Sequence, residues 1–292
     1  MIPRELFQKI RRLEVRTRGL VDNLFGGEYH TAFKGQGITF AEVRPYQIGD
    51  DVRTIDWNVS ARMGAPYVKL FEEEREQTLL LVVDVSGSQG FGVRGRTKRE
   101  LAAEICAVLG FSALRNHDRV GLLLFTDRIE AFVPPRKGRR HVLRLVRDLY
   151  ACRPGSTRTD LRVALDYLMR VLHRRAIILI LSDFLDMPDF ERPLRALARR
   201  HDVVALQLRD PVEQTWPAVG LVELVDAETG RRRWIDTRSA RVRAHLAEQA
   251  RRQQAELEAC FRRLQIDHVC LRTEADYVEP LLAFFHRRNR RR

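Results

Sequence analysis

Asp84, Ser86 and Ser88 form a D-x-S-x-S pattern directly after the apolar run 79–83. A continuous apolar run of this length predicts a buried strand that ends at the carboxylate. The three side chains would then lie on a loop at the carboxyl end of the strand, where open α/β sheets bind their ligands. Their oxygen atoms are hard ligands, the kind that divalent cations such as Mg²⁺ prefer. The pattern therefore indicates a candidate metal site.

Two later segments offer further oxygen ligands. The loop 155–158 contains hydroxyl side chains and leads through Thr159 into a predicted helix, and the apolar strand 176–182 is followed by Asp183. The loops at the carboxyl edge of a doubly wound sheet can converge. We therefore predict that one divalent cation is held by Asp84, Ser86, Ser88, Thr159 and Asp183.

This ligand set would supply two negative charges and three neutral oxygens, so that water or a carboxylate from a partner could take the remaining position. Thr157 is an alternative to Thr159, and Asp127 fits either a group behind the ligands or a turn after a strand. A purely structural interpretation also stays open. In that case Asp84 and Asp183 cap helices or turns, and the serines are helix N-caps.

Strand and helix patterns alternate from residue 79 onward, which predicts βαβ units. The expected fold class is α/β, with a doubly wound, mostly parallel sheet and helices on both faces. The expected strands are 79–84, 119–125, 129–133, 176–182, 203–208 and 267–271, and the expected helices are 97–115, 139–150, 159–173, 190–200, 239–264 and 276–286.

The remaining segments suggest three parts. Residues 1–78 would hold a helix at 3–24, which Gly26-Gly27 ends, and an irregular β-rich segment. Residues 79–286 would form the α/β domain, with an inserted β-hairpin at about 211–238 that turns at Thr229-Gly230. The arginine-rich end, 287–292, would be a basic tail.

The site pattern resembles the metal-ion-dependent adhesion site of von Willebrand factor A domains. That family combines D-x-S-x-S with a threonine before a helix and an aspartate after a strand. All three features occur here in the same order, and the resemblance covers about 79–208. It implies a site for Mg²⁺ or Mn²⁺ that recognises a partner, for example a client carboxylate, through the metal and does not catalyse a reaction.

Residues 42–57 and 68–75 resemble the signature of a bacterial family of unknown function, number fifty-eight, whose members accompany MoxR-type AAA+ ATPases. The resemblance implies an adaptor or co-chaperone of such an ATPase. The chain has no G-x-x-x-x-G-K-[ST] phosphate loop, so the ATP chemistry would belong to the partner. The alternating charges of the signature would either order this segment or dock the ATPase.

Two other functions stay open. A serine hydrolase would use Ser88 with Asp183 and His268, although His268 falls within a strand pattern. The net charge of +13 would suit a nucleic-acid-binding protein, but no recognition motif accompanies it.

The sequence also bears on the compartment and on the cysteines. No apolar run reaches 18 residues, and the N-terminus lacks an apolar signal core. We therefore expect a cytoplasmic protein without a membrane span. Many members of the resembled family, by contrast, carry N-terminal membrane helices. The cysteines lack zinc spacing, and packing is their expected role: Cys106, Cys152, Cys260 and Cys270.

Overall fold

A computed structural model describes residues 11, 13–15, 17, 19–21, 29, 31–33, 38–73, 76–93, 95–185 and 189–291. The chain divides into two compact units. The larger unit comprises residues 1–32 and 78–292, and the smaller comprises 33–77. We describe each unit by itself.

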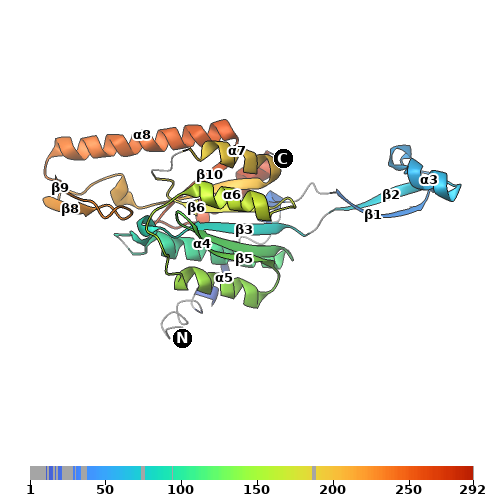
Figure 1. Ribbon diagram of the computed structural model, residues 1–292, viewed down its shortest axis with the longest axis horizontal. Helices are drawn as coiled ribbons and strands as arrows, with labels where there is room; N and C mark the ends of the chain where they lie inside the picture. The colour runs from blue at the N-terminus through green and yellow to red at the C-terminus, as the bar shows by residue number, and fades with distance from the viewer. Residues whose placement is uncertain are drawn as a thin grey trace. The chain divides into compact units, whose positions relative to one another are not determined.

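A six-stranded sheet forms the centre of the larger unit, with the order β10-β7-β6-β3-β4-β5 (Figure 1). Five strands are parallel, and β5 at one edge runs antiparallel to β4. This confirms the predicted α/β fold class with a mostly parallel sheet. The strand bounds are β3 Thr78–Asp84, β4 Arg119–Phe125, β5 Ile129–Arg136, β6 Ile177–Ser182, β7 Asp202–Arg209 and β10 Asp267–Arg272.

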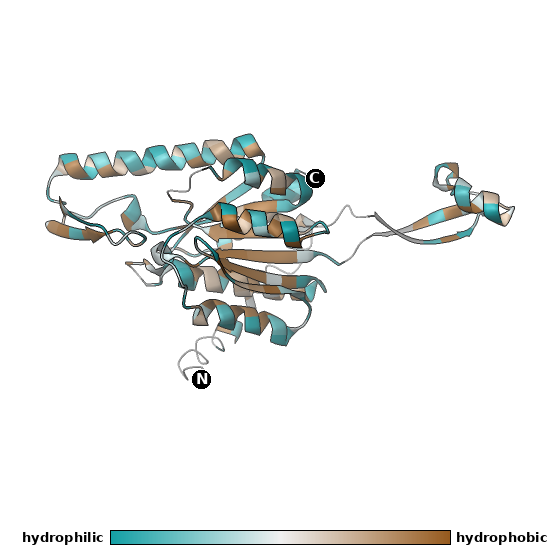
Figure 2. Ribbon diagram, viewed as in Figure 1, coloured by the Kyte–Doolittle hydropathy of each residue, from teal (hydrophilic) through white to brown (hydrophobic). Residues whose placement is uncertain are grey.

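Helices cover both faces of this sheet. Figure 1 shows α6, α7 and α8 on one face and α4 and α5 on the other. The first group packs on β3 and β6 through Leu80, Val82, Ile178 and Ile180. The sheet strands are strongly apolar, whereas α8 is largely polar (Figure 2). The helix bounds are α4 Lys98–Arg115, α5 Arg139–Ala151, α6 Leu161–Val171, α7 Glu191–Arg200, α8 Ala240–Leu264 and α9 Val278–Arg290.

The start of α4 is fixed by a reciprocal capping box. The hydroxyl of Thr97 accepts the backbone N–H of Glu100 at 3.1 Å, and the Glu100 carboxylate accepts the N–H of Thr97 at 3.0 Å. These bonds satisfy donors that a helix N-terminus otherwise leaves free. The second residue of the box, Lys98, is thereby held with its side chain inside the protein.

The predicted β-hairpin is present as β8, Leu221–Val225, and β9, Arg232–Asp236. Asp226 orders its turn, because the Asp226 carboxylate accepts the backbone N–H groups of Glu228 and Thr229 at 2.9 Å each. Gly230 closes the turn with a φ of 70°, a conformation that glycine adopts without a steric penalty.

The smaller unit is an antiparallel pair of strands, β1 Ile38–Pro45 and β2 Tyr67–Glu73, joined by a 3₁₀ turn at Val52–Thr54 and the helix α3, Trp57–Met63. Charged residues of the signature order this connection. Arg44 donates two hydrogen bonds to Asp50, each 2.8 Å long. Asp56 caps α3 by accepting the N–H groups of Asn58 and Val59. Trp57 is 68% exposed.

Three expectations about the termini require comment. The predicted helix at 3–24 lies largely outside the described residues, and its described members between 11 and 20 are helical; Gly26-Gly27 lies outside them altogether. Residues 1–32 belong to the larger unit, not with the β-rich segment. The basic residues 287–290 are part of α9 and are not a tail, because apolar contacts and ion pairs hold that helix on the domain.

None of the helices among the described residues is long and apolar enough to span a bilayer. The 25 residues of α8 satisfy the length alone, and charged side chains recur along it.

Candidate functional site

The Asp84 carboxylate is fully buried at the carboxyl end of β3. One oxygen, Oδ1, accepts the backbone N–H of Ser86 at 2.9 Å, and the other, Oδ2, accepts the hydroxyl of Ser182 at 2.8 Å. Ser182 is the last residue of the neighbouring strand β6. Asp84 therefore links the ends of two central strands, as the parallel register of the sheet requires.

Two serine hydroxyls lie on the loop that follows Asp84. The Oγ atoms of Ser86 and Ser88 are 3.2 Å apart. Gln89 extends the cluster, since its Nε2 donates to Ser88 Oγ at 3.3 Å. The side-chain carbonyl oxygen of Gln89 is buried and has no hydrogen-bond partner within the described part of the chain. The loop thus gathers oxygen atoms, one of which lacks a donor.

The loop before α6 lies directly beside these serines. The backbone N–H of Gly87 donates to the carbonyl of Thr157 at 2.9 Å. Thr159 donates its hydroxyl to Glu228 Oε1 at 2.8 Å, and its backbone N–H to Glu228 Oε2 at 3.3 Å. Thr157 donates its hydroxyl to the backbone carbonyl of Glu228 at 2.8 Å. Of the two threonines considered from sequence, Thr159 is therefore the one whose hydroxyl meets a carboxylate.

The Asp183 carboxylate is engaged by a cation from the chain itself. The ammonium group of Lys98, which is fully buried, donates to Asp183 Oδ2 at 2.8 Å and also pairs with Glu213. Asp183 Oδ1 accepts the backbone N–H of Leu185 at 3.3 Å. Asp183 therefore reaches the site with its charge largely compensated, unlike Asp84.

The electrostatic balance of the site follows from these contacts. Burial, followed by the negative charge of Asp183, raises the pKa of Asp84 to about 7, although hydrogen bonds from Ser86 and Ser182 oppose the shift. Burial also raises the pKa of Glu228. The pKa of Lys98 is lowered by burial but raised more by Asp183 and Glu213, so that its net shift is upward. The Lys98 ammonium group thus pairs with two carboxylates, those of Asp183 and Glu213.

The donor set fits a hard divalent cation. Asp84, Ser86 and Ser88 present only oxygen atoms, and no basic side chain forms an ion pair with Asp84 in the described part of the chain. No group of three or more His, Cys, Asp or Glu side chains has a metal-binding arrangement among the described residues. Two predicted ligands already have partners: Thr159 contacts Glu228, and Asp183 contacts Lys98.

Asp127 takes no part in this cluster through the contacts that the structure shows. Its carboxylate accepts the hydroxyl of Thr126 at 3.4 Å and lies 3.6 Å from Arg128. The geometry therefore favours a turn residue over a group behind the metal ligands.

His268, the base considered for the hydrolase alternative, lies away from Ser88. His268 lies on β10, which β7 and β6 separate from β3. Three strand spacings amount to about 14 Å, too far for contact with Ser88. The His268 ring instead forms a hydrogen bond of 3.0 Å with Gln207 and stacks on Phe261.

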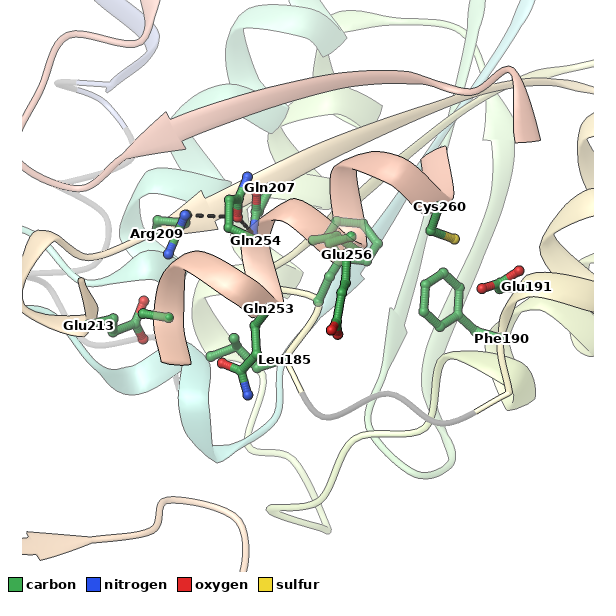
Figure 3. Close-up of a pocket in the computed structure, with 13 residues that line it drawn as sticks. Leu185, Phe190, Glu191, Gln207, Arg209, Glu213, Gln253, Gln254, Glu256 and Cys260 are labelled. Atoms are coloured by element: carbon green, nitrogen blue, oxygen red, sulfur yellow. Dashed lines mark hydrogen bonds between the residues drawn. The ribbon is translucent and has the colours of Figure 1, made fainter. Parts of the chain in front are cut away.

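A separate cavity of about 390 Å³ lies between α7, α8 and the end of β7 (Figure 3). Three of its polar side chains are paired with each other, since Gln254 Oε1 accepts from Arg209 at 2.7 Å and from Gln207 at 3.0 Å. Glu213, a partner of Lys98, lines this cavity as well. Through Glu213 the cavity adjoins the Lys98–Asp183 side of the candidate metal site.

Sequence reasoning missed Lys98 and Glu228. Lys98 carries no signal in the sequence, because a lysine in the first turn of a helix is ordinarily exposed. Glu228 was part of the predicted hairpin, but only the packing of the turn on Thr157 and Thr159 shows that its carboxylate faces the site.

The fold and the site together define a doubly wound α/β protein that carries the ligand pattern of a von Willebrand factor A domain. The chain belongs to the family described as "Protein of unknown function DUF58", whose sequence profile matches residues 42–256.

Similar proteins support the family assignment. The uncharacterized protein Mb1516 of Mycobacterium bovis is 35% identical over 288 residues, which cover 98% of this chain and 90% of the relative. A Paracoccus denitrificans protein, described as an uncharacterized protein in the moxR 3' region, is 38% identical over 95 residues, covering 32% of this chain and 86% of the relative.

Among solved structures, the conserved hypothetical protein BatB from Bacteroides thetaiotaomicron matches with a TM-score of 0.46 and 12% identity, over 73% of this chain and 99% of BatB. The SpRpn10 VWA domain matches with a TM-score of 0.36 and 9% identity, over 71% of this chain and 93% of that domain.

Proposed function

We propose that this protein is a metal-dependent protein-interaction module that binds Mg²⁺ or Mn²⁺ and does not catalyse a reaction. The observation that carries the proposal is the buried Asp84 carboxylate, which has no basic ion-pair partner in the described part of the chain and lies beside the hydroxyls of Ser86 and Ser88. A buried carboxylate of this kind is costly unless a cation or hydrogen bonds compensate it. A divalent cation would remove most of that cost.

The residues around such a site would have different roles. Asp84, Ser86 and Ser88 would hold the cation, which when bound supplies a positive centre for an acidic group of a partner. The hydrogen bonds from Ser86 N–H and Ser182 fix the orientation of the Asp84 carboxylate. Thr159 would complete the oxygen set, and Asp183, held by Lys98, would act through an intervening water.

We further propose that the protein is an adaptor or co-chaperone of a MoxR-type AAA+ ATPase. The similarity to a protein in a moxR 3' region supports this proposal, because neighbouring bacterial genes often encode proteins that act together. The exposed apolar residues of the smaller unit, Ile48, Trp57 and Met63, would suit a docking surface for a protein. A cytoplasmic location stays a prediction.

The two alternative functions have weaker support. His268 is not placed to act as the base of Ser88, as the sheet order indicates. Part of the basic C-terminus is used within the domain, since Arg288 pairs with Asp202 and Asp267. It is therefore less available to bind a phosphate backbone than a free tail would be.

Thermal unfolding with and without metal tests the metal site. A metal concentration about a hundredfold above Kd adds about 2.7 kcal/mol to the free energy of unfolding, which for a protein of this size raises Tm by about 4 °C. We expect this rise with Mg²⁺ or Mn²⁺ in the wild type and not in Asp84→Asn. Asp127→Asn is the matched control and should respond as the wild type does. An equal rise in Asp84→Asn would exclude Asp84 as a metal ligand.

The partner is tested by affinity capture from the native cells. Wild-type protein should retain an AAA+ ATPase in Mg²⁺, and both a chelator and Asp84→Asn should reduce the retained amount. Capture that is equal in all three samples would separate the ATPase partnership from the metal site.

A further inference from the structure

The carboxylate of Glu228 occupies the Thr159 side of the candidate metal site. Its two oxygens accept both donors of Thr159, the hydroxyl at 2.8 Å and the backbone N–H at 3.3 Å. Glu228 comes from the turn of the β8–β9 hairpin, 69 residues further along the chain. The site therefore already binds one carboxylate, and the chain itself supplies it.

The turn that carries Glu228 is shaped to fit this position. Asp226 orders the backbone of Glu228 and Thr229, and Thr157 holds the Glu228 carbonyl at 2.8 Å. The turn also packs closely on the serine loop. A Cβ atom placed on Gly87 would collide with the carbonyl oxygen of Ala227, so only glycine allows the loop and the turn to approach this closely.

The strands of the hairpin, by contrast, are weakly attached. No residue of β8 or β9 is buried. Burial begins at the base of the hairpin, where Thr237 donates its hydroxyl to the Gly220 carbonyl at 2.7 Å and accepts the Gly220 N–H at 3.0 Å. An element with few buried contacts opens locally at a low free-energy cost. The hairpin thus has a base that is fixed to the domain, and polar contacts and the close approach to Gly87 hold its tip against the site.

We propose that Glu228 is a built-in substitute for the acidic group of a partner, and that the β8–β9 hairpin is a latch over the site. A partner carboxylate would take the place of the Glu228 carboxylate on Thr159 once the turn 226–230 has moved away. This inference rests on the proposed metal-dependent function and identifies the group that the site recognises as a carboxylate.

The latch lowers the apparent affinity for a partner carboxylate, because the tethered Glu228 competes at a high effective concentration. A partner that also binds the hairpin would relieve this competition. The alternative is that the contacts of Glu228 only fasten the hairpin to the domain. The two roles differ in one respect, because removal of a latch must expose a site that can bind a carboxylate.

Acetate is the probe for that site. The backbone amide resonance of Thr159 is followed by NMR while acetate is added to the full chain in Mg²⁺. In Glu228→Ala we expect a saturable shift, with half-saturation at an acetate concentration at least about tenfold lower than in the wild type. Glu223→Ala is the matched control, since Glu223 lies on the same hairpin and pairs only with the exposed Arg232 among the described contacts. It should behave as the wild type does.

A second variant loosens the latch without removing the carboxylate. Thr157→Val deletes the hydrogen bond to the Glu228 carbonyl and leaves Thr159 and Glu228 intact. We expect half-saturation between the values for the wild type and Glu228→Ala. Circular dichroism melts of each variant establish that it is folded before the titration.

Mn²⁺ separates failure of the latch from failure of the metal site. Electron paramagnetic resonance counts bound Mn²⁺, and water proton relaxation reports water at the bound ion. If wild type and Glu228→Ala both bind Mn²⁺, relaxation should be greater in Glu228→Ala, because water can enter where the Glu228 carboxylate lay. Equal relaxation together with no acetate shift overturns the latch while the metal function stands. If neither protein binds Mn²⁺, the metal function fails. An acetate shift in Glu228→Ala would then still support the carboxylate site, and the lack of such a shift would overturn that site as well.

Discussion

The ammonium group of Lys98 lies 2.8 Å from Asp183 Oδ2, and both side chains are almost completely buried. This pair places the start of α4 against the end of β6, two elements that are far apart in the sequence. It supplies a permanent positive charge next to the candidate metal site. Lys98 therefore compensates the charge of Asp183, whereas no basic side chain in the described part of the chain pairs with Asp84, the carboxylate that a bound cation would compensate.

Replacing Lys98 by methionine tests this ion pair. The substitution keeps an unbranched side chain that is one atom shorter and leaves Asp183 without its cation, and breaking a buried pair in this way costs about 3–5 kcal/mol. We expect a loss of that size in the free energy of unfolding, measured by urea denaturation at neutral pH. The double variant Lys98→Met/Asp183→Asn should recover part of the loss. Arg140→Met, at an exposed position, is the control and should change the stability little.

The capping box of α4 gives a second prediction. Thr97→Ala removes the acceptor of the Glu100 N–H, and loss of an N-cap of this type costs about 1 kcal/mol. Thr97→Ser retains a hydroxyl and should cost much less. Urea denaturation of both variants checks the difference, and equal stabilities for the serine and alanine variants would show that the hydroxyl is not the stabilising group.

His201 gives a prediction about pH. Neither ring nitrogen has a hydrogen-bond partner in the described part of the chain, and its pKa is lowered, first by burial and then by Arg200 and Arg175. The unfolded chain therefore binds a proton more readily than the folded protein. The stabilising effect of neutral His201 is complete above pH 6.5 and is lost as the pH falls below it, at a rate of at most about 1.4 kcal/mol for each pH unit.

The measurement compares wild type and His201→Leu. The free energy of unfolding from urea denaturation should fall between pH 7.5 and pH 5.5 in the wild type, and the fall should be smaller in the leucine variant. The same fall in both proteins would mean that other groups cause the pH dependence.

The sequence was sufficient for those parts of the site that follow from one strand and the loop after it. Asp84, Ser86 and Ser88 lie together because an apolar strand, a carboxylate and two hydroxyls follow each other within ten residues. The α/β class with a mostly parallel sheet follows from the alternation of helix and strand patterns in the same way. A local pattern of this kind determines how neighbouring residues lie relative to one another, so these residues can be placed without knowing how distant segments pack.

The parts that sequence reasoning missed depend on contacts between distant segments. Lys98 and Asp183 are 85 residues apart, and Thr159 and Glu228 are 69 residues apart. Neither pair has a spacing that a periodic pattern could reveal. Compositional reasoning also misassigned residues 287–290, because a run of arginines reads as a solvated end unless its acidic partners on β7 and β10 are known.

The C-terminal arginines give the last prediction. Arg288 pairs with Asp202 and Asp267 and donates to the carbonyl of Ala32 at 3.0 Å, so one side chain joins α9, two strands and the N-terminal segment. Arg288→Met should lower the free energy of unfolding by about 3 kcal/mol, because it removes the guanidinium group that pairs with two partly buried carboxylates. Arg290→Met removes the same charge from an exposed position of the same helix and should cost less than about 0.5 kcal/mol. Urea denaturation of the two variants distinguishes an integral helix from a dispensable basic end. If both losses of stability were equally small, the contacts of Arg288 would contribute nothing to stability. Residues 287–290 would then act as the tail that their composition suggests.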